Sequence, residues 1–190
     1  VLFEFFLFTV FFLGVGSTAM RTLQCAFVAV AFGQHNPPTW PSTVQVFGPE
    51  TDNIQEVVDA AFANNGGFEP EDNGQFSDKR YAFLFKPGSY SVDVPVGYYT
   101  QVAGLGQLPT DVVFTAGKGV HCDEGSHTMG IGALNTFWRS AENFHTQSDY
   151  PWIPGRNGMQ WAVSQASPLR RIVVDNDLVL YAYRSGNAAD

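Results

Sequence analysis

One helical pattern, at residues 54–62, is followed by a long series of short β-type runs. Five apolar residues recur at helical spacing before the Asn-Asn-Gly-Gly segment at 64–67 ends the pattern: Ile54, Val57, Val58, Ala61 and Phe62. Runs typical of strands occupy residues 43–47, 81–85, 90–94, 98–103, 112–115, 130–138, 142–146, 160–165, 171–174 and 178–183. Together with the 19 Gly and 11 Pro of the whole chain, these runs predict a sandwich, a barrel or a β-solenoid rather than a helical bundle.

The spacing of three runs favours the solenoid among these folds. Val112, Thr136 and Gln160 each begin a run, about 24 residues apart, which is a typical length for one solenoid coil. A lone amphipathic helix before the first coil would cover the open end of the core, and solenoids need such caps.

The charge balance of the chain argues against a nucleic-acid partner. The formal net charge is −8, and only 15% of the residues are charged. An acidic chain with ten Lys and Arg residues lacks the clustered cations that phosphate neutralisation needs, so no nucleic-acid partner is expected.

The N-terminal region reads as a targeting segment in either of two ways. In one, residues 1–19 are a signal peptide cut after Ser17-Thr18-Ala19. In the other, which the sequence favours, Met20 is the start, residues 20–33 are the signal peptide and residues 1–19 are an untranslated leader. The apolar run at 7–15 is short for a bilayer, so no stable membrane span is expected.

The rest of the chain is expected to contain a linker and one domain. Residues 34–42 carry three prolines and read as an extended linker before a domain at 43–190. Cys25 would leave with the signal peptide, so Cys122 remains as a single thiol and a disulfide framework is not expected.

Several motifs carry a family resemblance. The Ile54-Gln55 helix and the strand and turn at 80–90 resemble the N-terminal cap of pectate-lyase-like right-handed parallel β-helices. Residues 96–106, 135–143 and 161–171 look like a secreted β-helix family of bacteria and fungi. Some of its members are labelled adenylyl cyclase, a name that nothing in these residues supports.

The resemblance implies a fold and a class of substrate. The fold would be all-β, a right-handed parallel β-helix (solenoid), of which this chain holds the N-terminal helix cap and the first coils. Superfamily members are mostly polysaccharide lyases and glycoside hydrolases, including a glucanase branch, and their chains are longer than this one. We therefore expect a fragment, truncated at the C-terminus and inactive alone, whose missing coils complete the enzyme.

The catalytic candidates are two acids near a strand. Glycoside hydrolysis generally needs two carboxylates across the scissile bond. Asp175 and Asp177 form the best local cluster, although Asp-Asn-Asp also suits a plain turn. A Ca²⁺-assisted lyase is the alternative for clustered acids. His121, His127 and His145 lack metal-ligand spacing, and neither a metal nor a cofactor is expected.

The substrate-binding candidates are aromatic and basic side chains. Trp138, Arg139 and Trp161 occupy similar places in successive runs, where an exposed ring beside an arginine would stack on sugars. Alternatively, both tryptophans fill the interior, as large aromatics usually do.

Two classes of function remain open. The favoured one is a secreted carbohydrate-active enzyme, a polysaccharide glycoside hydrolase rather than a lyase. The other is a non-catalytic β-helix that binds glycans or mediates adhesion.

Overall fold

The computed structural model describes residues 39–66, 74–115, 117–122 and 136–181. All of them belong to one compact unit, Thr39–Asp190. The predicted leader and signal peptide, and the linker up to residue 38, lie outside the described residues, as does most of the predicted run at 130–138.

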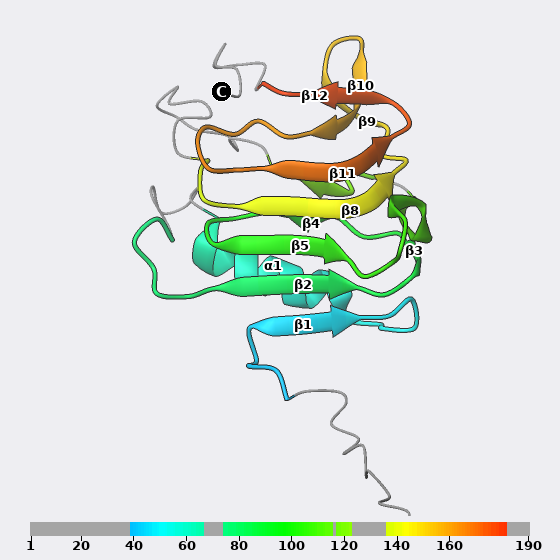
Figure 1. Ribbon diagram of the computed structural model, residues 1–190. Coiled ribbons are helices and arrows are strands. Elements are labelled where there is room, and N and C mark those ends of the chain that lie inside the picture. The colour runs from blue at the N-terminus through cyan, green and yellow to red at the C-terminus, as the bar shows by residue number, and fades with distance from the viewer. Residues whose placement is uncertain (1–38, 67–73, 116, 123–135, 182–190) are drawn as a thin grey trace, which may run out of the picture. The chain divides into compact units, whose positions relative to one another are not determined.

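The predicted helix is confirmed as α1, Ile54–Asn65, with one face buried against the strands (Figure 1). Ile54, Val58 and Ala61 lie on that face at helical spacing and join the hydrophobic core. Asn65 ends the helix. Its buried Nδ2 donates to the carbonyl oxygens of Tyr98 at 2.9 Å and Lys79 at 3.2 Å, which ties the end of the helix to the start of the next strands.

Five parallel strands form the main stack of the molecule (Figure 1). In spatial order they are β1 (Val44–Phe47), β2 (Tyr81–Phe85), β5 (Thr100–Gly104), β8 (Ser140–Thr146) and β11 (Leu169–Val174). The register places Phe83, Val102 and Ala141 in one line, and all three are buried. Alternate residues of each strand therefore face the core.

Shorter strands continue the path of the chain away from the main stack. β3 (Gly88–Tyr90) and β6 (Val112–Phe114) pair in parallel, and β6 follows a short 3₁₀ helix at Pro109–Asp111. The remaining strands are β4 (Val94–Pro95), β7 (Val120–His121), β9 (Tyr150–Ile153), β10 (Arg156–Gln160) and β12 (Asp177–Val179). β4 pairs with β7 and β10 with β12, both in parallel, whereas β9 and β10 form an antiparallel hairpin.

β8 links two of these strand groups. Its first residues, Ser140–Glu142, pair with β5, whereas His145 and Thr146 pair with β6. The strand therefore bends from one group into the next, and the parallel sheet curls. A mostly β chain with one helix and a curled sheet of parallel strands is consistent with part of a β-helix.

Aromatic rings fill the core between α1 and the strands. Phe114 packs edge-on against Phe85 at 5.0 Å and against Phe144 at 5.3 Å, so the rings of three strands interlock. The Tyr90 hydroxyl donates to the Lys86 carbonyl oxygen at 2.7 Å. Burial, followed by the charge of Glu50, raises the pKa of Tyr90 to about 12, which keeps this donor protonated.

Three expectations about the strands were wrong. Of the three residues predicted to begin runs about 24 residues apart, Val112 begins β6, but Thr136 lies outside the described strands and Gln160 ends β10. Along the main stack Val44 pairs with Ala82, Ala82 with Gln101 and Gln101 with Ser140, so the spacing is irregular. The run at 90–94 is split between β3 and β4. β7 and β9 were not expected, because two buried residues and a Pro-containing hairpin strand give no alternating pattern.

Candidate functional site

Residues at the starts of neighbouring strands form what we call the entry column. Arg80 directly precedes β2, Tyr99 precedes β5, Trp138 lies two residues before β8 and Ala166 lies three before β11. The Tyr99 N–H donates to the Trp138 carbonyl oxygen at 2.6 Å, and the Trp138 N–H donates to the Gln165 carbonyl oxygen at 3.2 Å. These backbone bonds align the column from strand to strand.

The entry column contains unusual backbone conformations. Tyr99, Trp138 and Ala166 have φ values of 53°, 55° and 52°, in the left-handed region. Bulky side chains are rare there, and each such residue costs on the order of 1–3 kcal/mol. The surrounding structure must therefore hold these residues in place.

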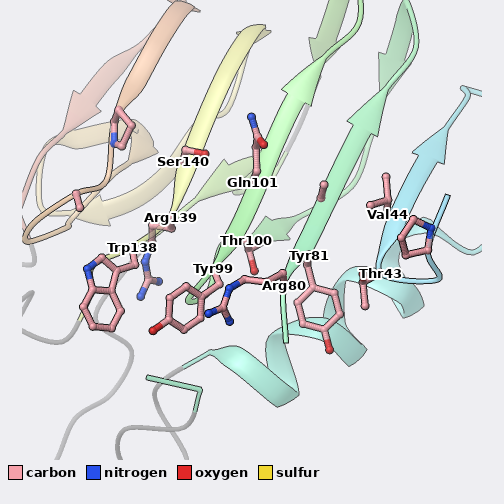
Figure 2. A pocket seen from close by; sticks show the side chains of 14 residues that line it. Thr43, Val44, Arg80, Tyr81, Tyr99, Thr100, Gln101, Trp138, Arg139 and Ser140 are labelled. Carbon is pink, nitrogen blue, oxygen red and sulfur yellow. The ribbon is translucent and has the colours of Figure 1, made fainter. Parts of the chain in front are cut away.

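The side chains of the entry column stack on one another (Figure 2). The Arg80 guanidinium carbon lies 3.7 Å from the centroid of the Tyr99 ring. The Tyr99 and Trp138 rings lie 5.4 Å apart at an interplanar angle of 20°. The Tyr99 hydroxyl donates to the Gln75 carbonyl oxygen at 2.8 Å, which fixes the middle ring. Trp138 at the end of the stack is 39% exposed.

A shallow groove of about 580 Å³ runs beside this stack. Its lining residues are Pro41, Thr43, Val44, Arg80, Tyr81, Ala82, Tyr99, Thr100, Gln101, Trp138, Arg139, Ser140, Ala166 and Pro168. None of these described residues is acidic, although the chain has a net charge of −8. Aromatic faces beside hydroxyl and amide groups suit an uncharged, hydroxyl-rich ligand.

The other two substrate-binding candidates do not reach solvent. Arg139 is 3% exposed, and its Nη1 donates to the Val96 carbonyl oxygen at 2.5 Å and lies 3.3 Å from the Cys122 sulfur. Trp161 is 2% exposed and donates from Nε1 to the Ser167 carbonyl oxygen at 2.9 Å. The predicted pair of an exposed ring beside an available arginine is therefore not formed, because Trp138 is exposed and the Arg139 side chain is buried.

The acidic candidates Asp175 and Asp177 lie around the turn between β11 and β12. The His145 Nε2 lies 2.7 Å from an Asp175 carboxylate oxygen, and the Gln147 amide donates to the other oxygen at 3.2 Å. The hydrogen bond to His145 is the main cause that holds the pKa of Asp175 below its ordinary value. Asp177 pairs with Arg156 at 3.3 Å.

The residues of this turn do not form a pair of catalytic acid and base. A general acid needs a raised pKa, whereas Asp175 is held ionised. Asn176 donates from Nδ2 to the Ser148 carbonyl oxygen at 2.8 Å, so the middle residue of the turn is a structural tie.

The histidines and acids of the described residues do not gather into a metal site. Within them, no group of three or more His, Cys, Asp or Glu side chains could hold a metal ion. His121 lies buried beside the Gly119 carbonyl oxygen, His145 faces Asp175, and His127 lies outside the described residues. In the same part of the chain, no helix has the length and apolar character needed to cross a bilayer.

Two members of the stack were missed by sequence reasoning. Tyr99 was read as part of a strand and Arg80 as part of a family motif. The useful signal was the register that places residues 80, 99 and 138 side by side, and no local pattern carries it.

The chain is similar in sequence to part of a known glucanase. No protein-family model matches the chain. The chain is 39% identical over 153 residues to an exo-beta-1,3-glucanase of Streptomyces sp. (strain SirexAA-E / ActE), which covers 75% of this chain and 22% of the relative. This chain is homologous to a segment of a glycoside hydrolase.

Solved structures agree with the glycoside hydrolase homology. The structure of sacteLam55A from Streptomyces sp. SirexAA-E matches with a TM-score of 0.64 and 38% identity, over 78% of this chain and 24% of that one. A variant of sacteLam55A in complex with glucose matches over the same shares with a TM-score of 0.63. The chain thus spans less than a quarter of the proteins that it matches.

Proposed function

We propose that this chain is the helix-capped first part of a secreted β-helix glycoside hydrolase that acts on β-1,3-glucan. The observation that carries the proposal is the 39% identity to an exo-beta-1,3-glucanase over 153 residues. The class of substrate comes from that relative, and the groove without acids along the entry column is compatible with a neutral glucan.

The finer description of the fold is part of this proposal. A right-handed parallel β-helix with α1 as its cap accounts for five parallel strands stacked in register and for the buried face of α1. The pectate-lyase-like motifs at 54–61 and 80–90 support it. Secretion rests on the pattern of a short basic start and an apolar segment at 20–33.

Hydrolysis by this chain alone is not expected. A glycoside hydrolase needs two carboxylates, about 5–5.5 Å apart for retention or about 6.5–9.5 Å for inversion, one of them protonated when the bond breaks. Asp175, held ionised by His145, suits only the role of the base or the nucleophile. The chain spans 22% of the glucanase relative, so we assign the acid to the rest of the proposed enzyme.

The test is product analysis with the whole protein that contains this chain. Incubation with laminarin should release glucose, whereas the 190-residue chain alone should release none. Release of unsaturated sugars instead of glucose would contradict hydrolysis and indicate a lyase. Absence of any product from a panel of glycans, together with retained binding, would favour the non-catalytic glycan-binding alternative.

A further inference from the structure

The exposed end of the Arg80–Tyr99–Trp138 stack has the features of a binding platform. Trp138 keeps 39% of its surface exposed although the rest of its ring packs on Tyr99 and Phe137. Among the described residues, its indole N–H has no hydrogen-bond partner. A ring with an exposed face and an available donor suits a ligand that has both C–H faces and hydroxyl groups.

The platform is rigid before any ligand arrives. The Arg80 guanidinium packs on the Tyr99 ring, and the Tyr99 hydroxyl donates to the Gln75 carbonyl oxygen. The Tyr99 N–H donates to the Trp138 carbonyl oxygen. The Arg80 Nη1 itself donates to the carbonyl oxygens of Ser77 at 2.8 Å and Lys79 at 2.9 Å. Such preorganisation reduces the entropy that binding would otherwise cost.

The backbone of the platform adopts a strained conformation. Tyr99 and Trp138 adopt left-handed φ values of 53° and 55°, which Gly or Asn would adopt at lower cost. Strain of this kind clusters at ligand sites, where the side chain rather than the backbone is needed. Tyr99 and Trp138 carry their rings on this conformation, and Ala166 adopts it at the next position of the entry column without a ring.

The groove beside the platform determines the charge of the ligand. Gln101 is exposed and Ser140 is half-buried, and both line the groove with neutral polar groups. The one exposed cation, Arg80, lies over the Tyr99 ring and is tied to two carbonyls. Apart from Arg80, the exposed and half-buried polar groups of the described lining are uncharged.

We infer that the Trp138 platform and its groove bind a stretch of a neutral β-1,3-glucan chain, with one glucose ring stacked on Trp138. The linkage rests on the proposed function, whereas the stacking and the neutral character rest on the side chains described above. Nothing in the inference requires this chain to be catalytic.

The experiment is a titration of the 190-residue chain with laminarihexaose, followed by intrinsic tryptophan fluorescence and calorimetry. Trp138→Asn removes the ring, and asparagine tolerates the left-handed φ at this position. This variant should weaken binding at least about tenfold. Trp138→Tyr should keep binding within about threefold, because it keeps a stacking ring. Raising the salt concentration should leave the affinity unchanged, because no ion pair is involved.

The matched control is Tyr150→Asn. Tyr150 is 38% exposed, packs on Trp152 at 4.6 Å and has the Lys118 ammonium 5.1 Å from its ring, but it does not line the groove. Its replacement should leave the affinity unchanged. Circular dichroism and thermal unfolding would verify that each variant is folded.

The outcomes separate this inference from the proposed function. Equal binding by wild type and Trp138→Asn, equal losses in Trp138→Asn and Tyr150→Asn, or equal affinity for cellohexaose would overturn the inference. If the whole protein hydrolyses laminarin while any of these results holds, only the binding site is wrong. If the whole protein leaves laminarin intact, the proposed function fails whatever the platform binds.

Discussion

Two lines of residues in the main stack contain left-handed backbone conformations but differ in what their side chains do. The entry column holds Tyr99, Trp138 and Ala166 at positive φ. A second line, the bend column, consists of Gly104, Asn143 and Arg171, where Asn143 and Arg171 have φ values of 60° and 54°. It lies where β8 bends between its pairing with β5 and its pairing with β6.

The side chain of Asn143 supports the bend. Its Nδ2 donates to the carbonyl oxygens of Gly104 and Gly106, both at 2.8 Å, and so pairs two backbone groups that the bend leaves without strand partners. In the entry column only the Tyr99 ring bonds a backbone group, through its hydroxyl to the Gln75 carbonyl oxygen, whereas the Trp138 ring is left 39% exposed. The same backbone conformation therefore supports the bend in one column and presents an exposed ring in the other.

The largest loss of stability is expected from one added methyl group in the bend column. A Cβ on Gly104 would lie 2.0 Å from the Asn143 backbone oxygen, so Gly104→Ala should lower the free energy of unfolding by about 3–5 kcal/mol. Urea unfolding measures this loss.

Gly155→Ala is the control for the methyl group. Gly155 has a φ of +78° but nothing within 4 Å of its added Cβ, so only backbone strain of about 1–2 kcal/mol is expected. Equal losses in the two variants would show that crowding at the bend is unimportant.

The next largest effect should come from Asn143 itself. Asn143→Ala removes both amide hydrogen bonds and places a less tolerant residue at positive φ, so it should cost about 2–3 kcal/mol. Asn143→Gly keeps the φ freedom and should recover about 1 kcal/mol of that loss. A larger loss for Gly than for Ala in the same unfolding experiment would contradict the role given to φ.

A smaller effect on stability is expected in the entry column. Trp138→Asn should change the free energy of unfolding by at most about 1 kcal/mol, because the lost ring pair is partly offset by relieved strain. Thermal unfolding beside Asn143→Ala makes the comparison direct. A loss as large as that of Asn143→Ala would make both columns structural.

The smallest effect should depend on pH. The pKa of Asp175 is below its ordinary value of 3.8 because of His145, so the folded state favours the ionised form. The stability that this adds is complete above 3.8 and is lost as the pH falls through the folded pKa. Asp175→Asn should therefore be less stable than wild type at neutral pH, and the difference should vanish in acid.

NMR titration of the Asp175 carboxyl carbon in His145→Gln gives an independent check, since its pKa should rise toward the ordinary value. Trp138→Asn should follow the wild-type pH dependence, because its groove has no acidic lining residue among those described. A stability difference for Asp175→Asn that persists at low pH would contradict the assigned cause.

The sequence predicted elements better than it predicted contacts. The start of α1 at Ile54 and the bounds of β2 at Tyr81–Phe85 follow from spacing and from a continuous apolar run, which are local properties. The alignment of Arg80, Tyr99 and Trp138 depends on the lengths of the connections between strands, and those lengths are irregular. Of the two interpretations of Trp161, the structure supports the ring that fills the interior, since this ring is buried.

The double pairing of β8 has a consequence for how the molecule opens. β8 has described partners in β5, β6 and β11, whereas β1 pairs only with β2 among the described strands. Amide protons of Ala141 and Phe144 should therefore exchange with solvent more slowly than those of β1, because their release requires several ladders to separate together. Local unfolding would start at β1 and reach β8 last, which makes β8 the strand that sets the cooperativity of the unit.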